Sequence, residues 1–540
     1  MISTAANAAH VAAPSADSRA PHECDVLVVG GGINGAGIAR DLAGRGLKVV
    51  LCEKDDLAAH TSSSSTKLIH GGLRYLEYYE FSLVRKALAE REVLLKSAPH
   101  IMWPLRFVMP HDPSSGFVRP VWMIRIGLFL YDHLAKREVL PGSRTVNLRE
   151  HPAGAPLKKG FTKGFVYSDG WVDDARLVVL NAIDAAEHGA SVLTGWRCSD
   201  AQRGADAWQV QLESSGGEHH ALKARALVNA AGPWAAQFLA EQAHRPRAKS
   251  LRLVKGSHIV VKKLFDHDHA YIFQNPDKRI IFAIPYEHDF TLIGTTDVEE
   301  HGAIGQARID ESETAYLCEQ ASRYFERAIT PGDVVWTYSG VRPLLDDESG
   351  DPSAVTRDYL LDLDDAPNEA PLLTVWGGKI TTFRKLAEEA ADLLAAPLRA
   401  TRGAWTRAAH LPGGDLSGWI GKAQRPDTDF ARFVQAVKLR HPELPDALCR
   451  RLARAYGARI EQVIGTGALG AQVAPGLYEA ELHYLHEHEW ARSAADVLWR
   501  RSKLGLHLNE AQRAAVADWC AAHWSPAPSA AAMNTERAWN

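Results

Sequence analysis

Cysteine is scarce and scattered in this chain of 540 residues. The six cysteines include no CxxC pair and stand far apart, at Cys24, Cys52, Cys198, Cys318, Cys449 and Cys520. This spacing argues against a disulfide scaffold, a structural zinc site and an iron–sulfur cluster. Unpaired cysteines are typical of a reducing compartment, so we expect a cytoplasmic protein.

Long hydrophobic runs are also missing. The most apolar stretch, residues 121–134, is interrupted by Arg125 and Asp132 and is shorter than the roughly 20 apolar residues that a membrane-spanning helix needs. The first 22 residues have neither a basic start nor a continuous apolar centre. We interpret residues 1–22 as a disordered tail and not as a signal peptide.

Neither sign of charge dominates. Lysines and arginines number 61 and acidic residues 65, which gives a net charge of −4, and 46% of the residues are apolar. These are ordinary globular values, and near-neutral charge disfavours a dedicated nucleic-acid-binding protein. At roughly 100 to 200 residues per domain, the length predicts about three domains.

The most informative segment begins at Cys24 and reads as strand, glycine turn, helix and strand. Gly30, Gly32 and Gly35 form GxGxxG in this turn, and Glu53 follows about twenty residues later at the end of the second strand. The glycines allow the backbone to approach a pyrophosphate at the helix N-terminus, and the acidic residue accepts hydrogen bonds from a ribose. The segment therefore predicts a Rossmann-type dinucleotide-binding domain.

A second GxGxxG, at Gly465, Gly467 and Gly470, lacks this context. A helical pattern precedes it and Pro475 follows it, so we interpret it as a loop. With one dinucleotide site, the chain can hold a flavin as a fixed redox group but has no evident place for a nicotinamide partner as well.

The rest of the chain predicts two further domains, and the expected fold class is α/β. Apolar spacing predicts helices over 81–96 and 173–188, and Gly216-Gly217 predicts a hairpin. Two β-rich runs around Glu287-His288-Asp289 predict an antiparallel sheet between about 251 and 297. We expect residues 23–400 to interleave the Rossmann-type domain with a mixed-sheet substrate domain, whose sheet lies mainly in 245–335. A helical C-terminal domain is expected over 411–523, followed by a disordered tail, 524–540.

A loop of small hydroxyl residues and glycines, from His60 to Gly72, follows the first domain segment. Such a composition suits a loop around a polar ligand, although a flexible linker has the same composition. Arg74 and Tyr75 come directly after it, where they are placed to hold a phosphate or a carboxylate.

Eight strings of the sequence together resemble one family. They are GGGINGAGIARDLAGRG, SSSSTKLIHGGLRYLE, YSDGWVDDARL, NAAGPW, KGSHIVV, IGTTDVE, WTYSGVRPL and GGKITTFRKLAE. Their order and register are similar to those of the FAD-dependent, aerobic-type glycerol-3-phosphate dehydrogenases, which belong to the D-amino-acid-oxidase-like flavoproteins. The resemblance extends from about Cys24 to Cys520. It implies FAD as cofactor, hydride transfer from C2 of sn-glycerol 3-phosphate to flavin N5, dihydroxyacetone phosphate as product, and electron transfer to a membrane quinone.

The resemblance also implies the residues around the flavin. The expected cofactor-binding residues are Gly30, Gly32, Asn34, Gly35, Glu53, Ser63, Ser65, His70, Gly378 and Thr381. Gly377 and Gly378 precede Lys379, and Thr381 or Thr382 is placed to cap a helix whose positive end points at the glycines. In similar proteins this end meets the flavin pyrimidine edge, where reduction leaves negative charge. An ordinary capped helix is the alternative.

Arginines are the residues that recognise a phosphate ester best, because their planar groups bind two oxygens at once. The expected substrate-binding residues are Arg74, Tyr75, Arg342 and Arg357. Any one arginine is more often a surface charge, so the phosphate assignments depend on the resemblance.

Oxidation of a secondary alcohol also needs a base. His258 alternates with apolar neighbours in KGSHIVV and so lies on one face of a strand. A lone strand histidine is usually structural, but the resemblance favours His258 as the base, with Lys379 as the second candidate. The expected catalytic residues are thus His258, Lys379 and Arg342. His483, His486 and His488 form no metal motif, and we predict no metal.

A membrane surface is the remaining expected partner. Residues 117–137 mix basic residues (Arg119, Arg125, Lys136, Arg137) with apolar ones (Trp122, Met123, Ile126, Leu128, Phe129). That composition suits an element lying on a membrane and equally a core helix. The resemblance favours peripheral attachment to the inner face of the cell membrane. The sequence does not decide between a monomer and a homodimer. The competing functions are an amine or amino-acid oxidase of the same fold and a non-catalytic flavin-bearing membrane scaffold.

Overall fold

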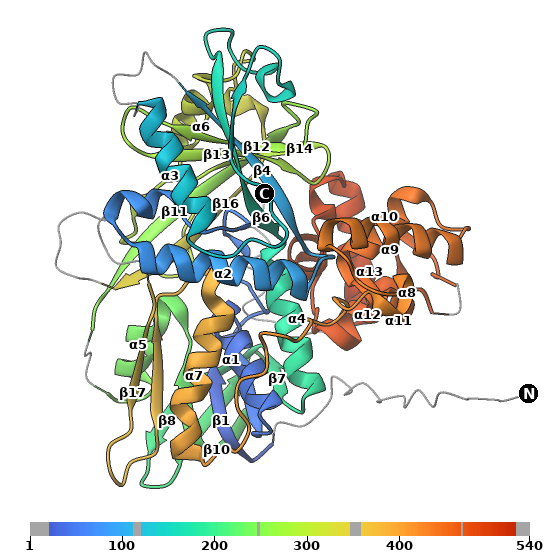
Figure 1. Ribbon diagram of the computed structural model, residues 1–540. Coiled ribbons are helices and arrows are strands. Elements are labelled where there is room, and N and C mark those ends of the chain that lie inside the picture. The colour runs from blue at the N-terminus through green and yellow to red at the C-terminus, as the bar shows by residue number, and fades with distance from the viewer. Residues whose placement is uncertain (1–20, 112–119, 246–248, 346–357, 466–467, 525–540) are drawn as a thin grey trace, which may run out of the picture.

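Two sheets and a group of C-terminal helices make up the protein (Figure 1). The computed structural model describes residues 21–111, 120–245, 249–345, 358–465 and 468–524. In Figure 1 the first sheet lies in the lower half of the molecule, the second in the upper half, and the C-terminal helices at one side.

The first sheet has eight strands, and its centre is parallel. β1 (Glu23–Val29) lies between β10 (His219–Asn229) and β2 (Val49–Glu53), and the order is β17-β18-β10-β1-β2-β7. Residues Val26 to Val29 of β1 are an unbroken apolar run, because both faces of the strand are covered there. The remaining strands are β7 (Ser191–Thr194), β8 (Trp196–Arg203), β9 (Trp208–Ser214), β17 (Leu360–Asp364) and β18 (Leu372–Trp376). β9 and β10 form the predicted hairpin around Gly216-Gly217.

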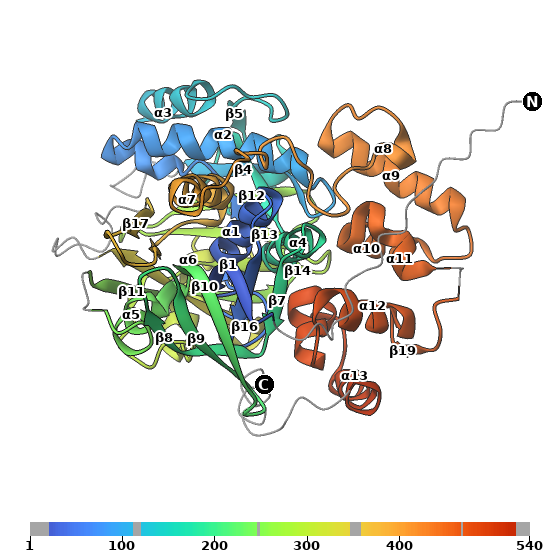
Figure 2. The same ribbon diagram turned by 90° about the horizontal axis from the view of Figure 1, so that it is seen from below.

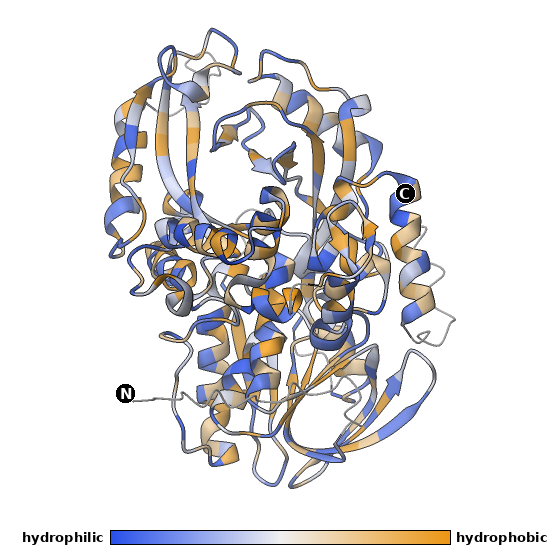
Figure 3. Cartoon of the chain, turned by 90° about the vertical axis from the view of Figure 1, so that its right-hand side faces the viewer, coloured by the Kyte–Doolittle hydropathy of each residue, from blue (hydrophilic) through white to orange (hydrophobic). Residues whose placement is uncertain are grey.

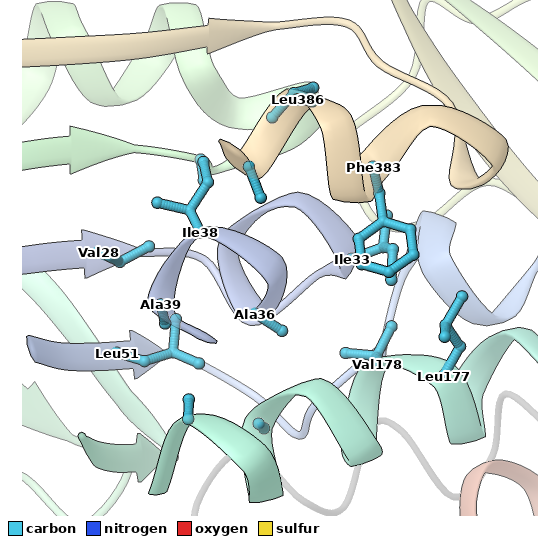
Figure 4. Packing of buried hydrophobic residues seen from close by; sticks show 14 of the residues in the cluster. Val28, Ile33, Ala36, Ile38, Ala39, Leu51, Leu177, Val178, Phe383 and Leu386 are labelled. Carbon is cyan, nitrogen blue, oxygen red and sulfur yellow. The ribbon is translucent and has the colours of Figure 1, made fainter. Parts of the chain in front are cut away.

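Helix α1 (Ile33–Gly44) packs between α4 (Asp174–Glu187) and α7 (Phe383–Leu398) on one face of this sheet (Figure 4). Gly37 makes the approach of α7 close, since a Cβ atom at this position would lie 2.9 Å from a ring carbon of Phe383. The tight packing of α1 fixes its N-terminus relative to the loop before α7.

The second sheet has ten strands, in the order β15-β11-β14-β13-β12-β4-β6-β3, with β16 against β11 and β5 against β6. It takes in more of the chain than residues 245–335, because four strands come from residues 68–172. These are β3 (Leu68–Ile69), β4 (Met102–His111), β5 (Arg144–Asn147) and β6 (Lys163–Val172). The others are β11 (Leu251–Lys262), β12 (His269–Gln274), β13 (Ile280–Tyr286), β14 (Phe290–Gly294), β15 (Val298–Glu299) and β16 (Val334–Leu345). Helices α2 (Phe81–Ser97), α3 (Val121–His133) and α6 (Glu311–Ser322) belong to this half of the molecule.

The C-terminal helices form a third group with its own apolar core (Figure 2). They are α8 (Ser417–Ile420), α9 (Pro426–Arg440), α10 (Asp446–Tyr456), α11 (Ile460–Ile464), α12 (Glu479–Glu489), a π-helical segment (Asp496–Arg501) and α13 (Glu510–His523). The second GxGxxG begins directly after α11, so a helix and not a strand precedes its described part. β19 (Gln472–Ala474) and β20 (Leu477–Tyr478) form a small hairpin here.

Buried ion pairs join this third group to the first sheet. Asp56, just after β2, accepts hydrogen bonds of 2.6 Å from both Arg500 and Arg501. Burial alone would raise the pKa of Asp56, but the two guanidinium groups hold it below its usual value. A second buried pair joins Arg176 of α4 to Glu489 of α12, with Nη2 and Oε1 3.0 Å apart. The C-terminal helices are therefore attached at the loop that leaves the first βαβ unit.

Most helices carry both hydrophobic and hydrophilic residues, as expected for elements with one covered face (Figure 3). Within the described ranges, no helix combines the length and the apolar character required for a membrane crossing.

Candidate active site

The glycine turn between β1 and α1 is held closely enough that side chains do not fit. Gly30 has φ +112°, and a Cβ atom on it would lie 2.5 Å from the carbonyl oxygen of Ala230. A Cβ atom on Gly35 would lie 1.9 Å from the carbonyl oxygen of Gly30. Only glycine therefore permits this tight turn, which places backbone N–H groups at the N-terminus of α1, where they attract a phosphate.

Two side chains contact the start of this helix. Glu53, at the end of β2, accepts a hydrogen bond of 2.6 Å from the Gly31 N–H. Burial raises the pKa of Glu53, and backbone N–H groups partly offset this effect. The hydroxyl of Ser62 accepts a hydrogen bond of 2.9 Å from the Ile33 N–H. Ser62 was not among the predicted residues.

The predicted second glycine segment lies against the first. Asn34, at the start of α1, donates from Nδ2 to the carbonyl oxygen of Gly377 over 3.1 Å. A Cβ atom on Gly378, which has φ +101°, would lie 2.7 Å from Asn34 Nδ2. Asn34 Oδ1 is buried and has no hydrogen-bond partner among the described residues. Two glycine cradles that exclude side chains and an unsatisfied amide oxygen between them fit an extended polar cofactor.

Residues 60–72 include β3 of the second sheet and also contact α1, which covers the first sheet. The Thr61 hydroxyl donates to the Val341 carbonyl over 2.7 Å, and the Tyr338 hydroxyl donates to the Ser65 carbonyl over 2.9 Å. His70 N–H donates to Thr381 Oγ1 over 3.2 Å. The structure therefore brings His70 and Thr381 together, as the expected cofactor site requires.

The other two predicted serines of this segment have protein partners. The Ser63 hydroxyl donates to the His60 carbonyl over 3.2 Å, and the Ser65 hydroxyl donates to Asp174 over 2.7 Å. Asp174, in the first turn of α4, also pairs with the buried Lys67. Neither Lys67 nor Asp174 was predicted, because a lysine among serines and an acidic helix start have many roles.

His258 lies on β11 and is only 2% exposed. Its Nε2 is 2.9 Å from Thr66 Oγ1, and its ring stacks on Tyr338 of β16 with 4.7 Å between centroids. On the β14 side only a glycine fits, because a Cβ atom on Gly294 would lie 2.1 Å from the imidazole. His258 Nδ1 has no hydrogen-bond partner among the described residues.

The imidazole of His258 is neutral at neutral pH. Burial, followed by the positive charges of Arg342 and Lys67, holds the pKa of His258 well below its usual value. When Nε2–H donates to Thr66, the lone pair of Nδ1 is left to accept a proton. Nδ1 is itself buried, so the arrangement can act as a base towards a hydroxyl group that enters the site as far as this atom.

Arg342 lies further along β16, beyond Tyr338. It bonds Asp297 over 2.5 Å and Thr295 Oγ1 over 3.2 Å, and its side chain is one third exposed, at 33%. A carboxylate thus orients the guanidinium group while part of it stays open to an anion.

The remaining predicted cations have different settings. Lys379 Nζ lies 4.0 Å from the centre of the Tyr75 ring, so the structure brings these two residues together. Thr382 is the N-cap residue of α7, after the 3-10 turn Ile380–Thr382. Arg74 Nη2 is 3.4 Å from the Tyr78 hydroxyl. Arg357 lies outside the described residues.

The glycine turn gives a test of cofactor binding. We expect Gly35→Ala to abolish or strongly weaken flavin binding, because its Cβ atom would overlap the Gly30 carbonyl oxygen. Flavin absorbance released per mole of purified chain measures this. Gly127→Ala is the control, since no atom lies within 4 Å of the added Cβ atom. Full flavin content in the Gly35 variant would contradict the assignment.

Comparison with protein families identifies two matches that cover most of the chain. Residues 25–384 match the family described as FAD dependent oxidoreductase (DAO). Residues 404–525 match the C-terminal domain of alpha-glycerophosphate oxidase.

Curated relatives match almost end to end. The glycerol-3-phosphate dehydrogenase of Pseudomonas aeruginosa is 53% identical over 91% of this chain and 93% of its own length. The aerobic glycerol-3-phosphate dehydrogenase of Escherichia coli is 50% identical over 92% of this chain and 97% of its own length. A D-erythritol 1-phosphate dehydrogenase of Brucella abortus is 51% identical over 92% of this chain and 98% of its own length.

A solved structure agrees with these relatives. The glycerol-3-phosphate dehydrogenase from Bacillus halodurans, complexed with FAD, superposes with a TM-score of 0.75 at 27% identity, covering 96% of this chain and 93% of that one. The resemblance and the fold class expected from the sequence are thereby confirmed, and FAD is the cofactor. The chain belongs to the family of FAD-dependent glycerol-3-phosphate dehydrogenases, within the DAO-type oxidoreductases.

Proposed function

We propose that the chain oxidises sn-glycerol 3-phosphate to dihydroxyacetone phosphate. The observation that carries this proposal is the buried, neutral His258 with an unoccupied ring nitrogen, whose pKa responds to the charge of Arg342. A base for a hydroxyl and a cation for a phosphate are the two groups that this substrate needs. Relatives about half identical to this chain carry the same activity in their names.

We assign the cofactor contacts to the residues that line the two glycine segments. Gly30, Gly32 and Gly35 would face the pyrophosphate, and Glu53 the ribose. Asn34, Gly378 and Thr381 lie where the two glycine segments meet, and Ser63, Ser65 and His70 belong to the segment beside them. Bound FAD would supply the acceptor for the hydride of the substrate carbon, which carries both electrons of the oxidation.

His258 would take the proton of the substrate hydroxyl at Nδ1. Its depressed pKa keeps the imidazole unprotonated at neutral pH, and the hydrogen bond to Thr66 fixes the ring orientation. Lys379 is the second candidate for this role. Its contact with the Tyr75 ring and its position before α7 also suit electrostatic support at the site.

Arg342 would bind the phosphate, with Asp297 holding its guanidinium group in place. Arg74, Tyr75 and Arg357 are the further substrate-binding residues that we propose from the family resemblance.

A second phosphorylated polyol deserves a direct comparison. The Brucella abortus relative named for D-erythritol 1-phosphate is 51% identical to this chain, as similar as the relatives named for glycerol 3-phosphate. The two compounds share a secondary alcohol and a phosphate ester, so the same base and the same arginine serve both. They differ by one CHOH unit, which for oxidation at C2 extends the end of the molecule away from the phosphate.

The substrate test is anaerobic bleaching of the bound flavin. We expect glycerol 3-phosphate to bleach it rapidly at low concentration, D-erythritol 1-phosphate to do so less efficiently, and amino acids to leave it yellow. Stopped-flow absorbance measures the three rates. Faster bleaching by the four-carbon ester would reassign the substrate, bleaching by amino acids would favour an oxidase, and no bleaching would favour a flavin-bearing scaffold.

Replacement of Arg342 separates substrate binding from cofactor binding. We expect Arg342→Ala to raise KM at least about tenfold, because a charge-assisted contact to phosphate contributes about 1.5–3 kcal/mol. The flavin spectrum should stay unchanged. Arg252→Ala, which removes an arginine paired with Glu299 on the neighbouring strand, is the control. A KM equal to that of the unmodified protein would show that Arg342 does not bind the substrate.

We further propose that the electrons pass to a membrane quinone and that α3 contacts the membrane on its inner face. Trp122, Ile126 and Phe129 of α3 are 62%, 52% and 57% exposed. Leu128 and Tyr131 of the same helix are buried, so its apolar residues are divided between a covered and an open face. Tyr78, Tyr79 and Phe81 are exposed on the neighbouring segment, which also carries Arg74 and Tyr75. An exposed apolar surface beside the substrate-binding residues suits an acceptor dissolved in lipid.

Vesicle binding tests this surface. We expect Ile126→Glu combined with Phe129→Glu to weaken sedimentation with anionic vesicles severalfold, because charged side chains replace the apolar face. Leu439→Glu is the control, since Leu439 is an even more exposed apolar residue, at 84%, on the C-terminal helices. Unchanged sedimentation of the double variant would exclude α3 as the contact.

A further inference from the structure

A buried lysine and a buried aspartate hold the segment that contacts His258. Lys67 is 1% exposed, and its Nζ lies 2.7 Å from Asp174 Oδ1 and 3.0 Å from the Ser63 carbonyl oxygen. Burial lowers the pKa of Lys67, and the charge of Asp174 opposes this effect. A lysine that is almost completely buried is costly unless it is paired, so the carboxylate is what allows Lys67 to stay charged there.

Asp174 is held in turn by the helix that it starts and by the segment itself. It lies in the first turn of α4, where the helix dipole stabilises negative charge, and its own helix supplies the Ala175 N–H over 2.9 Å. Its Oδ2 accepts from the Ser65 N–H over 3.1 Å and from the Ser65 hydroxyl over 2.7 Å. One carboxylate therefore binds the residues on both sides of Thr66.

Thr66 is the residue between these two anchors, and its hydroxyl lies 2.9 Å from His258 Nε2. Lys67 has φ +60°, a left-handed conformation that is uncommon for residues other than glycine. Such conformations persist where the surroundings impose them, and they gather at functional sites. The same segment also holds Tyr338, which stacks on one face of the imidazole and donates its hydroxyl to the Ser65 carbonyl oxygen.

We propose that Lys67 and Asp174 are positioning residues that fix Thr66 and Tyr338 against His258 and so set the orientation in which this histidine accepts the substrate proton. The inference rests on the proposed role of His258 as the base. It assigns a function to a buried ion pair that the family-derived site did not include.

The charges around His258 make this role measurable. Lys67 faces it from the segment before β3, and Arg342 faces it from β16. β16 also supplies the neutral Tyr338, and β14 supplies only Gly294. Loss of the Lys67 charge removes one of the two cations that oppose protonation of the imidazole, so the pKa of His258 should rise.

The experiment measures the rate of flavin reduction by glycerol 3-phosphate against pH, without oxygen. We expect Lys67→Met to lower the plateau rate at least about tenfold and to shift its acid limb upward by about one pH unit. Lys67→Arg should keep the acid limb near its original position. Thr66→Val should lower the plateau rate, and Thr66→Ser should restore it.

A double-mutant cycle tests whether the pair acts through Thr66. If it does, Thr66→Val should lower the plateau rate of flavin reduction much less in the Lys67→Met variant than in the unmodified protein. The mild Thr66 variants also keep the inference testable if Lys67→Met does not fold, which flavin content and melting temperature would reveal. The inference would be overturned if Thr66→Val lowered the plateau rate by the same factor with and without Lys67→Met. It would also be overturned if the acid limb did not move in a folded Lys67→Met protein.

Lys255→Met is the matched control. Lys255 is also a buried lysine. It lies on β11, three residues before His258, and pairs with Glu313 over 2.9 Å. We expect Lys255→Met to lower the melting temperature without moving the acid limb, because Lys255 is not among the groups that shift the pKa of His258. His258→Asn separates the two proposals. Normal reduction in that variant would overturn both the base and its positioning, whereas slow reduction with an unaltered Lys67→Met profile would overturn the positioning alone.

Discussion

The arrangement of the site depends on one segment, residues 60–72, that contacts elements of both halves of the molecule. Residues 60–72 cap the first helix through Ser62, bind β16 through Thr61 and meet the start of α7 through His70. These contacts connect α1 and α7, whose N-termini we assign to the cofactor, with β16, which carries Arg342. A shift of this stretch would move both halves of the site at once, so its fixed position is what makes the site a single unit.

The glycines contribute to the same constraint from the other side. Gly37 brings α7 close to α1, and Gly378 brings the loop before α7 close to Asn34. Close packing of these backbones brings the N-termini of α1 and α7 near each other. Two such N-termini suit FAD, whose pyrophosphate is anionic and whose flavin gains negative charge when it is reduced.

The sequence predicted the elements whose signals are local. The first βαβ unit, the helix at 81–96 and the turn at 287–289 were visible because glycines and apolar spacing determine them directly, and the structure has α2 at Phe81–Ser97 and β14 at Phe290–Gly294. The contribution of β3–β6 to the second sheet was not visible. β4 pairs with β12 across more than 150 residues of chain, and no local pattern encodes such a pairing.

The site was predictable to a similar degree. His258 and Arg342 were predicted because each stands in a string typical of the family, and the structure places them on neighbouring strands. Ser62 was missed because four consecutive serines have no period that shows which hydroxyl faces the helix. Lys67 and Asp174 were missed because their pairing exists only after α4 has packed, and a buried charge in a sequence looks the same as an exposed one.

The attachment of the C-terminal helices also bears on the order of synthesis. Asp56 and Arg176 leave the ribosome more than 300 residues before their partners, Arg500, Arg501 and Glu489. Until those partners emerge, a carboxylate beside the nucleotide-binding unit and a guanidinium on α4 must remain hydrated, which keeps that surface loosely packed. The last tenth of the chain thus completes the part made first, and a nascent polypeptide has to keep its early half from associating wrongly while the rest is being translated.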